Sequence, residues 1–156
     1  MPIVFSLGLG GMMRATGILE AILDSFKGFI NSTGSLVAST LLISYVTNCI
    51  GASQSFAAVM TGTLMAPLFE ERNFKPENLS RILEDAGTLG APLIPWNTNA
   101  VVAMNFLQVD YATYIPYCFL NYINPIISLI YGITGFSMTK YTEEEIRMKK
   151  AAEIAL

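Results

Sequence analysis

The stretch GTLGAPLIPWNTN at residues 87–99 decides the fold class of this chain. It lies between Asp85 and Asp110 in a run of about 24 residues without charge, and roughly 20 apolar residues suffice for a helix to cross a bilayer. Pro92 and Pro95 remove backbone donors and disfavour a continuous helix. Irregular backbone at membrane depth is tolerated where protein or a water-filled cavity surrounds it. Because discontinuous helices build the ion and substrate sites of secondary transporters, this stretch predicts a transporter.

Composition places the whole chain in a membrane. Of the 156 residues, 53% are hydrophobic and 13% are charged, whereas a soluble domain carries about 25% charged residues. The charge-free runs at 28–69, 86–109 and 111–139 are each longer than the roughly 20 residues of a spanning helix. We therefore predict an all-α integral membrane protein with the lipid bilayer as a partner.

Several classes of function are excluded by what the chain lacks. It contains no histidine, which removes His-based catalytic triads and the common zinc motifs. Cys49 and Cys118 are isolated within apolar runs, so we expect buried, inert thiols and no transition-metal site. Without paired intramembrane acids or a ligand cluster, the chain is not expected to be an enzyme or to need a cofactor. A net charge of -3 without a basic patch argues against nucleic acid as a partner.

The N-terminal region predicts two short segments. Residues 3–13 are apolar and Gly-rich but too short to span a bilayer. They fit either the second half of a transmembrane helix or an interfacial lead-in. In residues 18–26, apolar side chains recur at helical spacing, which indicates an amphipathic helix at the membrane surface.

The long charge-free stretch at residues 36–69 predicts a helical hairpin. As one straight helix it would measure roughly 51 Å, against a bilayer core of about 30 Å. Its middle, residues 48–55, is polar and contains Gly51. Two half-length apolar helices that meet at this polar turn give a re-entrant hairpin. One long helix, broken or strongly tilted, is the alternative.

The rest of the chain divides by its charges into five segments. We expect a short surface helix within 70–85, an interrupted span at 86–109, a turn at 110–116, a last span at 117–139 and a soluble helical tail at 140–156. Lys and Arg are concentrated in the first and the last of these segments. By the positive-inside rule both are cytoplasmic in a multi-pass protein of the cytoplasmic membrane, and Asp110 is external.

Two polar breaks within apolar segments carry the candidate ion-binding groups. A hard cation such as Na+ prefers hydroxyl, amide and carbonyl oxygens, and both breaks offer them. Polar side chains that merely join helices are the alternative. The candidate ion-binding or proton-coupling residues are Asn48, Ser53, Gln54, Ser55, Asp85, Thr88, Asn97, Thr98 and Asn99. The residues expected to shape the breaks are Gly51, Gly87, Gly90, Pro92, Pro95 and Trp96.

Asp85 is the candidate carboxyl that attracts the cation and exchanges a proton for it, because it stands directly before the interrupted span. In the alternative interpretation, it favours the positive end of the following helix. Tyr111, Tyr114 and Tyr117 are expected to form an interfacial aromatic belt.

The residues 84–99, EDAGTLGAPLIPWNTN, together with GGMMRATG at 10–17 and the polar stretch 48–55, resemble the C-type family of sodium–proton antiporters within the ion-transporter superfamily. The resemblance implies two inverted repeats, each with a re-entrant hairpin and a broken helix that meet near the bilayer midplane. Here the hairpin would be 36–69 and the broken helix 87–107. Ser53, Gln54 and Ser55 at the hairpin tip would face Asn97, Thr98 and Asn99.

Family members are several hundred residues long, so the chain resembles only their C-terminal portion. Residues 1–139 would then be the second repeat of the transporter domain, followed by the cytoplasmic tail at 140–156. The resemblance implies sodium–proton antiport, with this chain supplying half of the ion site and an N-terminal half or a homo-oligomer supplying the rest. Antiport coupled to malate or lactate is an alternative within the class. A non-transporting fragment or partner-binding module is the alternative outside it.

Overall fold

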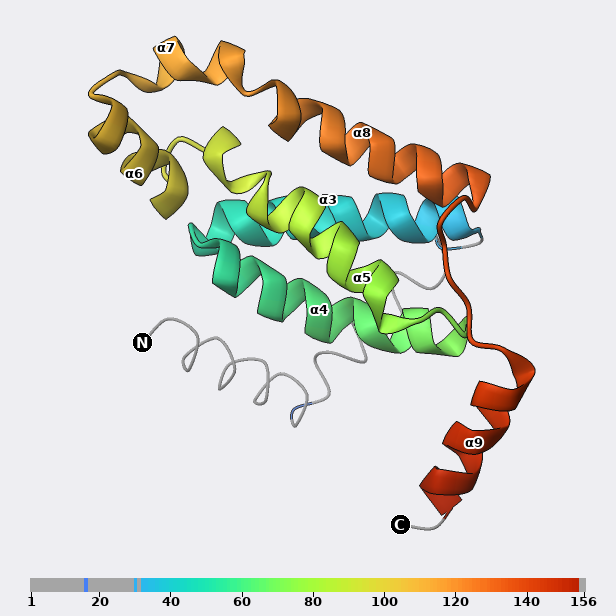
Figure 1. Ribbon diagram of the computed structural model, residues 1–156. Helices are drawn as coiled ribbons and strands as arrows, with labels where there is room; N and C mark the ends of the chain where they lie inside the picture. The colour runs from blue at the N-terminus through green and yellow to red at the C-terminus, as the bar shows by residue number, and fades with distance from the viewer. Residues whose placement is uncertain (1–15, 17–29, 31, 155–156) are drawn as a thin grey trace.

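The computed structural model describes residues 16, 30 and 32–154, most of them in helices (Figure 1). The two segments expected at residues 3–13 and 18–26 lie outside the described residues, apart from residue 16 in the gap between them. In chain order the described elements are α3 (Thr33–Gly51), α4 (Gln54–Glu71), α5 (Pro76–Leu83), the π-helix η1 (Glu84–Thr88), the 3-10 helix η2 (Ala91–Leu93), α6 (Thr98–Leu107), α7 (Tyr111–Tyr114), the 3-10 helix η3 (Ile115–Tyr117), α8 (Phe119–Thr134) and α9 (Glu143–Ile154).

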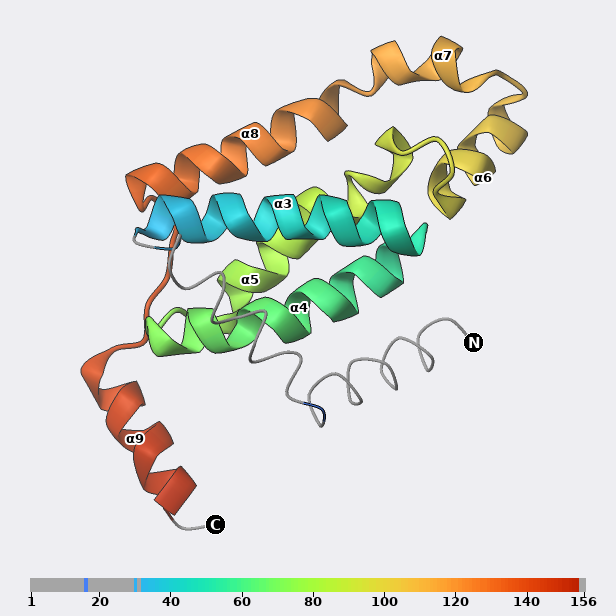
Figure 2. The same cartoon turned by 180° about the vertical axis from the view of Figure 1, so that it is seen from behind.

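The first two described helices form an antiparallel hairpin, seen side by side in Figures 1 and 2. A reciprocal capping box between Ser32 and Ser35 begins α3, and Ala52 in the left-handed conformation (φ 49°) ends it. The expected turn within 48–55 is thus confirmed against one long helix. With 19 and 18 residues, α3 and α4 measure about 28 and 27 Å. Each helix is thus about half as long as the stretch 36–69, as expected, and is nearly as long as a bilayer core of about 30 Å.

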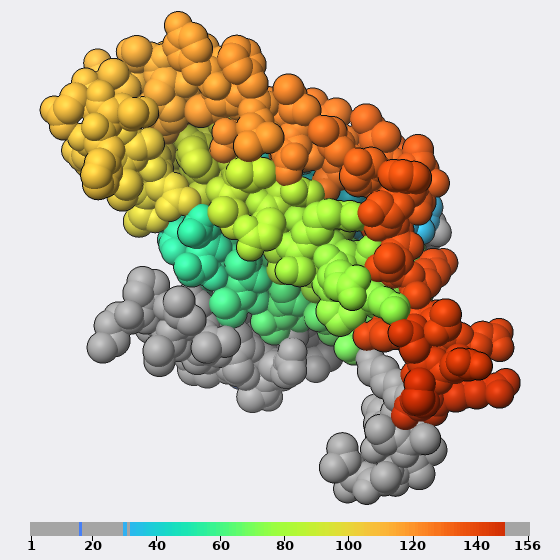
Figure 3. Space-filling model, in the orientation of Figure 1, coloured from blue at the N-terminus to red at the C-terminus, as the bar shows by residue number. Residues whose placement is uncertain are grey.

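The short helix expected on the surface within 70–85 is present as α5, with Pro76, Glu77 and Ser80 exposed and one face buried. It begins with Pro76 in its first turn, a position where the missing N–H of proline is no loss. Leu79 and Ile82 are buried, and the backbone continues without interruption from α5 into η1. Figure 3 shows this segment between α8 and α4 on one face of the molecule. The spacing predicted the helix correctly, but its apolar face packs on α4 and α3.

A single apolar cluster lies where α3, α4 and α5 meet. Helix α3 contributes on one side and α4 on the other, and the chain between α4 and η1 closes the cluster. Its buried members are Ile30, Leu36, Val37, Leu41, Ile43, Leu64, Met65, Leu68, Phe69, Phe74, Leu79, Ile82 and Ala86. This cluster fixes η1, and therefore Asp85, against the hairpin.

Helix α8 runs alongside α3, as Figures 1 and 2 both show, and glycines lie at their contact. A Cβ added to Gly132 would lie 2.6 Å from Cβ of Val37, and one added to Gly34 would lie 3.3 Å from Cα of Ile133. Small residues allow membrane helices to approach in this way. The helix has 16 residues and ends at Gly135 with φ 71°, so the last span is shorter than the expected 117–139.

Within the described residues, α3 is the one helix that is long and apolar enough, by length and composition, to cross a bilayer. Helices α6 and α8 are also apolar but shorter. The stretch expected to be an interrupted span, 86–109, thus holds several short elements, whereas the last expected span consists mainly of the single helix α8.

The segment after α8 is tied to the connection between α4 and α5. The N–H of Lys75 donates to the carbonyl of Thr139 over 3.1 Å, and the N–H of Tyr141 donates to the carbonyl of Asn73 over 2.9 Å. Lys75 Nζ and Glu145 Oε1 form an ion pair at 2.8 Å, which lowers the pKa of Glu145 to about 2. The 70–85 segment and the tail thus lie at one end of the molecule, and the side of the membrane that they face stays a prediction.

Candidate functional site

The hairpin tip and the break are joined by two fully buried asparagines. Nδ2 of Asn97 donates to Oδ1 of Asn48 over 2.7 Å, and Nδ2 of Asn48 donates to the carbonyl of Gly87 over 2.7 Å. Asn97 also caps α6, since its Oδ1 accepts from the N–H of Asn99. Because buried polar groups are costly without partners, this chain of bonds fixes η1, α3 and α6 relative to one another.

Other predicted residues complete the contact between the tip and the break. Nδ2 of Asn99 donates to Oε1 of Gln54 over 2.7 Å, and the N–H of Thr98 donates to the carbonyl of Ala52 over 3.1 Å. The structure therefore brings Asn48, Gln54, Asn97, Thr98 and Asn99 together. Whether these residues bind an ion stays a prediction.

Three predicted residues stand apart from this network. Ser53, Ser55 and Thr88 are half-buried, and the hydrogen bonds of the described residues do not link their side chains to it. Trp96 is 60% exposed, yet its Nε1 donates to the carbonyl of Cys49 over 2.8 Å. Cys49 itself is exposed, so the expectation of two buried thiols was wrong for this residue.

Asp85 is the second residue of the π-helical turn η1, whose backbone continues without interruption from α5. The residue is 9% exposed. Oδ1 accepts from Nδ2 of Asn124 over 2.5 Å, and Oδ2 accepts from Oγ of Ser128. Both donors belong to α8 and stand four residues apart, hence on one face of that helix. Asp85 is therefore a largely buried carboxyl that accepts hydrogen bonds from two neutral side chains.

The break itself spans 89–97 and contains Gly90, Pro92 and Pro95 as predicted. Gly90 is required by close packing, because a Cβ there would lie 2.1 Å from the carbonyl oxygen of Ala86 and 2.6 Å from Cε1 of Tyr45. The prolines leave backbone carbonyls without helical partners. Side chains of the following segment donate hydrogen bonds to carbonyl oxygens of the break.

Two tyrosines expected in an interfacial belt perform this role. The hydroxyl of Tyr111 donates to the carbonyl of Leu93 over 2.5 Å, and that of Tyr114 donates to the carbonyl of Pro92 over 2.8 Å. Asn121 similarly donates to the carbonyl of Leu89 over 2.5 Å. These two tyrosines thus have hydrogen-bond partners within the protein, and their place in an interfacial belt stays a prediction.

Sequence reasoning missed Asn124 and Ser128 as site residues, and it assigned no role to Ser44. Asn124 and Ser128 hold Asp85, and Ser44 lies one turn before Asn48 on α3. The available signal was spacing, since Ser44 and Asn48, like Asn124 and Ser128, are polar pairs four residues apart in apolar helices.

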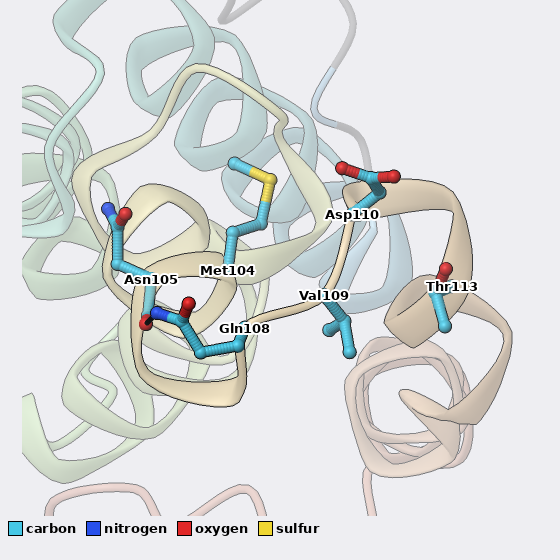
Figure 4. A pocket seen from close by; sticks show the side chains of 6 residues that line it. All are labelled: Met104, Asn105, Gln108, Val109, Asp110 and Thr113. Atoms are coloured by element: carbon cyan, nitrogen blue, oxygen red, sulfur yellow. Dashed lines mark hydrogen bonds between the residues drawn. The ribbon is translucent and has the colours of Figure 1, made fainter.

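A surface hollow of about 530 Å³ lies elsewhere, between α6 and α7. Figure 4 shows Met104, Asn105 and Gln108 on one wall and Asp110 and Thr113 on the other. None of these residues takes part in the polar network, so the hollow is separate from the candidate site.

Comparison with known proteins bears on this arrangement of a hairpin, a broken segment and a buried carboxyl. The sequence profile of the Na+/H+ antiporter family matches residues 2–136. The chain belongs to this family. The resemblance inferred from residues 84–99 is confirmed. Both polar breaks of the chain lie within the matched region.

Its relatives include antiporters of different named cargo. The arginine/ornithine antiporter ArcD of Halobacterium salinarum is 35% identical over 92% of this chain, and the Na(+)/H(+) antiporter NhaC of Bacillus subtilis is 36% identical over 83%. The malate-2H(+)/Na(+)-lactate antiporter of Bacillus subtilis is 29% identical over 85%. The chain spans 30%, 29% and 28% of the length of these relatives, respectively. No solved structure matches it significantly.

Proposed function

We propose that this chain supplies one half of the cation site of a sodium–proton antiporter, with Asp85 as the carboxyl that binds Na+ and H+ in turn. The proposal is carried by one observation, the burial of Asp85 between η1 and α8 with two neutral hydrogen-bond donors. Membership of the Na+/H+ antiporter family and the relatives named Na(+)/H(+) antiporter support sodium and protons as the cargo.

The chemistry follows from the partners of the carboxyl. A buried negative charge is expensive unless it is compensated, and neutral donors from Asn124 and Ser128 stabilise it without cancelling it. Arg81, one turn earlier on the same continuous helix, contributes part of the positive potential at this carboxyl. Either a proton or Na+ can supply the rest, and the two exclude each other on one carboxyl. Competition of this kind couples the loading of one ion to the release of the other.

The architecture supports a half-site rather than a complete site. The described residues form one hairpin and one broken segment in contact, whereas alternating access requires one repeat to move against another. We propose that residues 1–139 form the second of two inverted repeats, with the hairpin re-entrant, and that 140–156 form a cytoplasmic tail. An N-terminal half or a second copy would supply the opposing face.

The test uses the product of the complete reading frame that contains this chain, in everted membrane vesicles, with sodium-dependent dissipation of a pH gradient as the readout. Asp85→Asn keeps the size of the side chain and removes the titrating oxygen. We expect it to abolish sodium-dependent proton release. Glu77→Gln is the matched control, because it removes a carboxylate charge from an exposed side chain in the first turn of α5 and should leave exchange intact.

Two results would overturn the proposal. One is sodium–proton exchange that survives in Asp85→Asn at the wild-type rate. The other is a wild-type protein that shows no sodium-dependent flux, including the case in which it exchanges only arginine, ornithine, malate or lactate. Because vesicle content is measured by immunoblot, loss of activity is assigned only to variants that reach the membrane in normal amounts.

A further inference from the structure

Ser44 carries a buried hydroxyl that the fold leaves without a partner. The residue is 0% exposed, and its Oγ has no hydrogen bond among the described residues. Buried side-chain oxygens in native proteins are almost always bonded, so an exception requires an explanation. If this position only filled the apolar core, alanine would be more stable there than serine, because it has no hydroxyl to leave unbonded.

Neighbouring hydroxyls on the same helix behave differently. Oγ1 of Thr40 donates to the carbonyl of Leu36 over 2.7 Å, and Oγ1 of Thr47 donates to the carbonyl of Ile43 over 2.8 Å. Such back-bonding is the usual way for a hydroxyl to be satisfied within a membrane helix. Ser44 does not use it, so its lone pairs stay available to another group.

The hydroxyl faces the π-helical turn of the candidate site. A Cβ placed on Gly87 would lie 3.3 Å from Oγ of Ser44, and Gly87 stands two residues after Asp85. One turn further along α3, Asn48 donates to the carbonyl of Gly87. The carbonyl oxygen of Gly87 accepts the bond from Asn48, the side-chain oxygen of Asn48 accepts the bond from Asn97, and each oxygen has a second lone pair.

We propose that Oγ of Ser44 is a direct ligand of the transported cation, in a site between α3 and η1 that also draws on the carbonyl oxygen of Gly87 and Oδ1 of Asn48. This inference rests on the proposed antiport function and extends the ion site from Asp85 into the hairpin. Hydroxyl and carbonyl oxygens are the donors that a hard cation such as Na+ prefers. The hydroxyl oxygen of Ser44, which has no hydrogen-bond partner among the described residues, would then coordinate the cation.

The test compares sodium binding with stability in the purified product of the complete reading frame. Thermal unfolding is recorded in NaCl and in choline chloride at equal ionic strength, since a ligand that binds the folded state raises Tm. Ser44→Ala should lose most of the sodium-dependent rise and increase KM for Na+ about tenfold. In choline chloride its Tm should equal or exceed that of the wild type, because no bonded partner is removed.

Ser44→Cys provides a second variant of nearly the same volume, and its soft sulfur is a poor ligand for a hard cation. It should reproduce the loss seen with alanine. Thr40→Val is the matched control, because it removes a buried hydroxyl from the same helix whose bond stays within that helix. Its sodium-dependent rise in Tm should equal that of the wild type.

The outcomes separate this inference from the function on which it rests. If the wild type exchanges sodium while both Ser44 variants keep the wild-type KM and sodium-dependent Tm, the ligand role of Ser44 is wrong and the antiport proposal stands. If the wild type neither exchanges nor binds sodium, both proposals fail. Loss of the sodium response in both Ser44 variants but not in Thr40→Val supports the inference.

Discussion

The bond between Asn48 and Asn97 allows a quantitative test of how the hairpin tip holds the break. Both side chains are 0% exposed, and Asn97 Nδ2 lies 2.7 Å from Asn48 Oδ1. Asn97→Ala leaves that oxygen without its donor, and Asn48→Ala leaves that nitrogen without its acceptor. An unpaired buried polar group costs about 1–3 kcal/mol. Each single substitution should therefore lower the free energy of unfolding by at least about 1 kcal/mol.

The double substitution removes both partners, so the penalty for an unpaired group at this contact disappears. The sum of the two single effects then exceeds the effect of the double variant, and the difference is the coupling energy. Side-chain hydrogen bonds between membrane helices couple by about 0.6 kcal/mol on average and by about 1.7 kcal/mol at most. Because this pair is fully buried, we expect about 1–1.7 kcal/mol.

The assay is a double-mutant cycle in mixed micelles, with unfolding by SDS followed by far-ultraviolet circular dichroism. Asn105→Ala serves as the control partner, because Asn105 is exposed and its Nδ2 bonds the carbonyl of Val101 within α6. Combined with Asn48→Ala, it should be additive within about 0.5 kcal/mol. A coupling no larger than this for Asn48 and Asn97 would refute the reasoning that their bond joins the tip to the break.

Two further predictions concern helix packing and the tail. Gly132→Ala would place a methyl group 2.6 Å from Cβ of Val37, and overpacking of this kind should lower the free energy of unfolding by about 1–3 kcal/mol; an unchanged SDS midpoint would contradict it. The pKa of Glu145 is about 2 because Lys75 bonds its carboxylate, so the tail contact is complete above pH 4.5 and is lost as the pH falls towards 2. A carbon NMR titration of the Glu145 carboxyl checks this, and Lys75→Met should raise the measured pKa.

Local chemistry made the hairpin and the break predictable from the sequence. The polar residues 48–55 interrupt an apolar run, and the turn lies among them, at the left-handed Ala52. Glycine and proline in 87–99 likewise mark the irregular segment. Residues that interrupt a helix act through their own backbone preferences. They can therefore be recognised without knowing the tertiary structure.

Contacts over long sequence distances were not predictable. The spacing of Leu79 and Ile82 indicates an apolar helix face, but the same pattern serves a lipid-facing surface and a protein core. Asn124 and Ser128 meet Asp85 across 39 and 43 residues, because α8 returns along α3. The hydroxyls of Tyr111 and Tyr114 reach the break for the same reason, since the chain turns back after α6. From the sequence alone, these aromatic residues indicate an interfacial belt, and their hydrogen bonds to the break become visible only in the structure.

The chain contains a single tryptophan, and its indole N–H bonds the last turn of α3. Trp96 is therefore an intrinsic fluorescent probe of the contact between the break and α3. Separation of the break from α3 would release the indole N–H to solvent and shift its emission to longer wavelength. In the product of the complete reading frame, with any tryptophan outside this chain replaced by phenylalanine, stopped-flow fluorescence after mixing with sodium can accordingly time that movement.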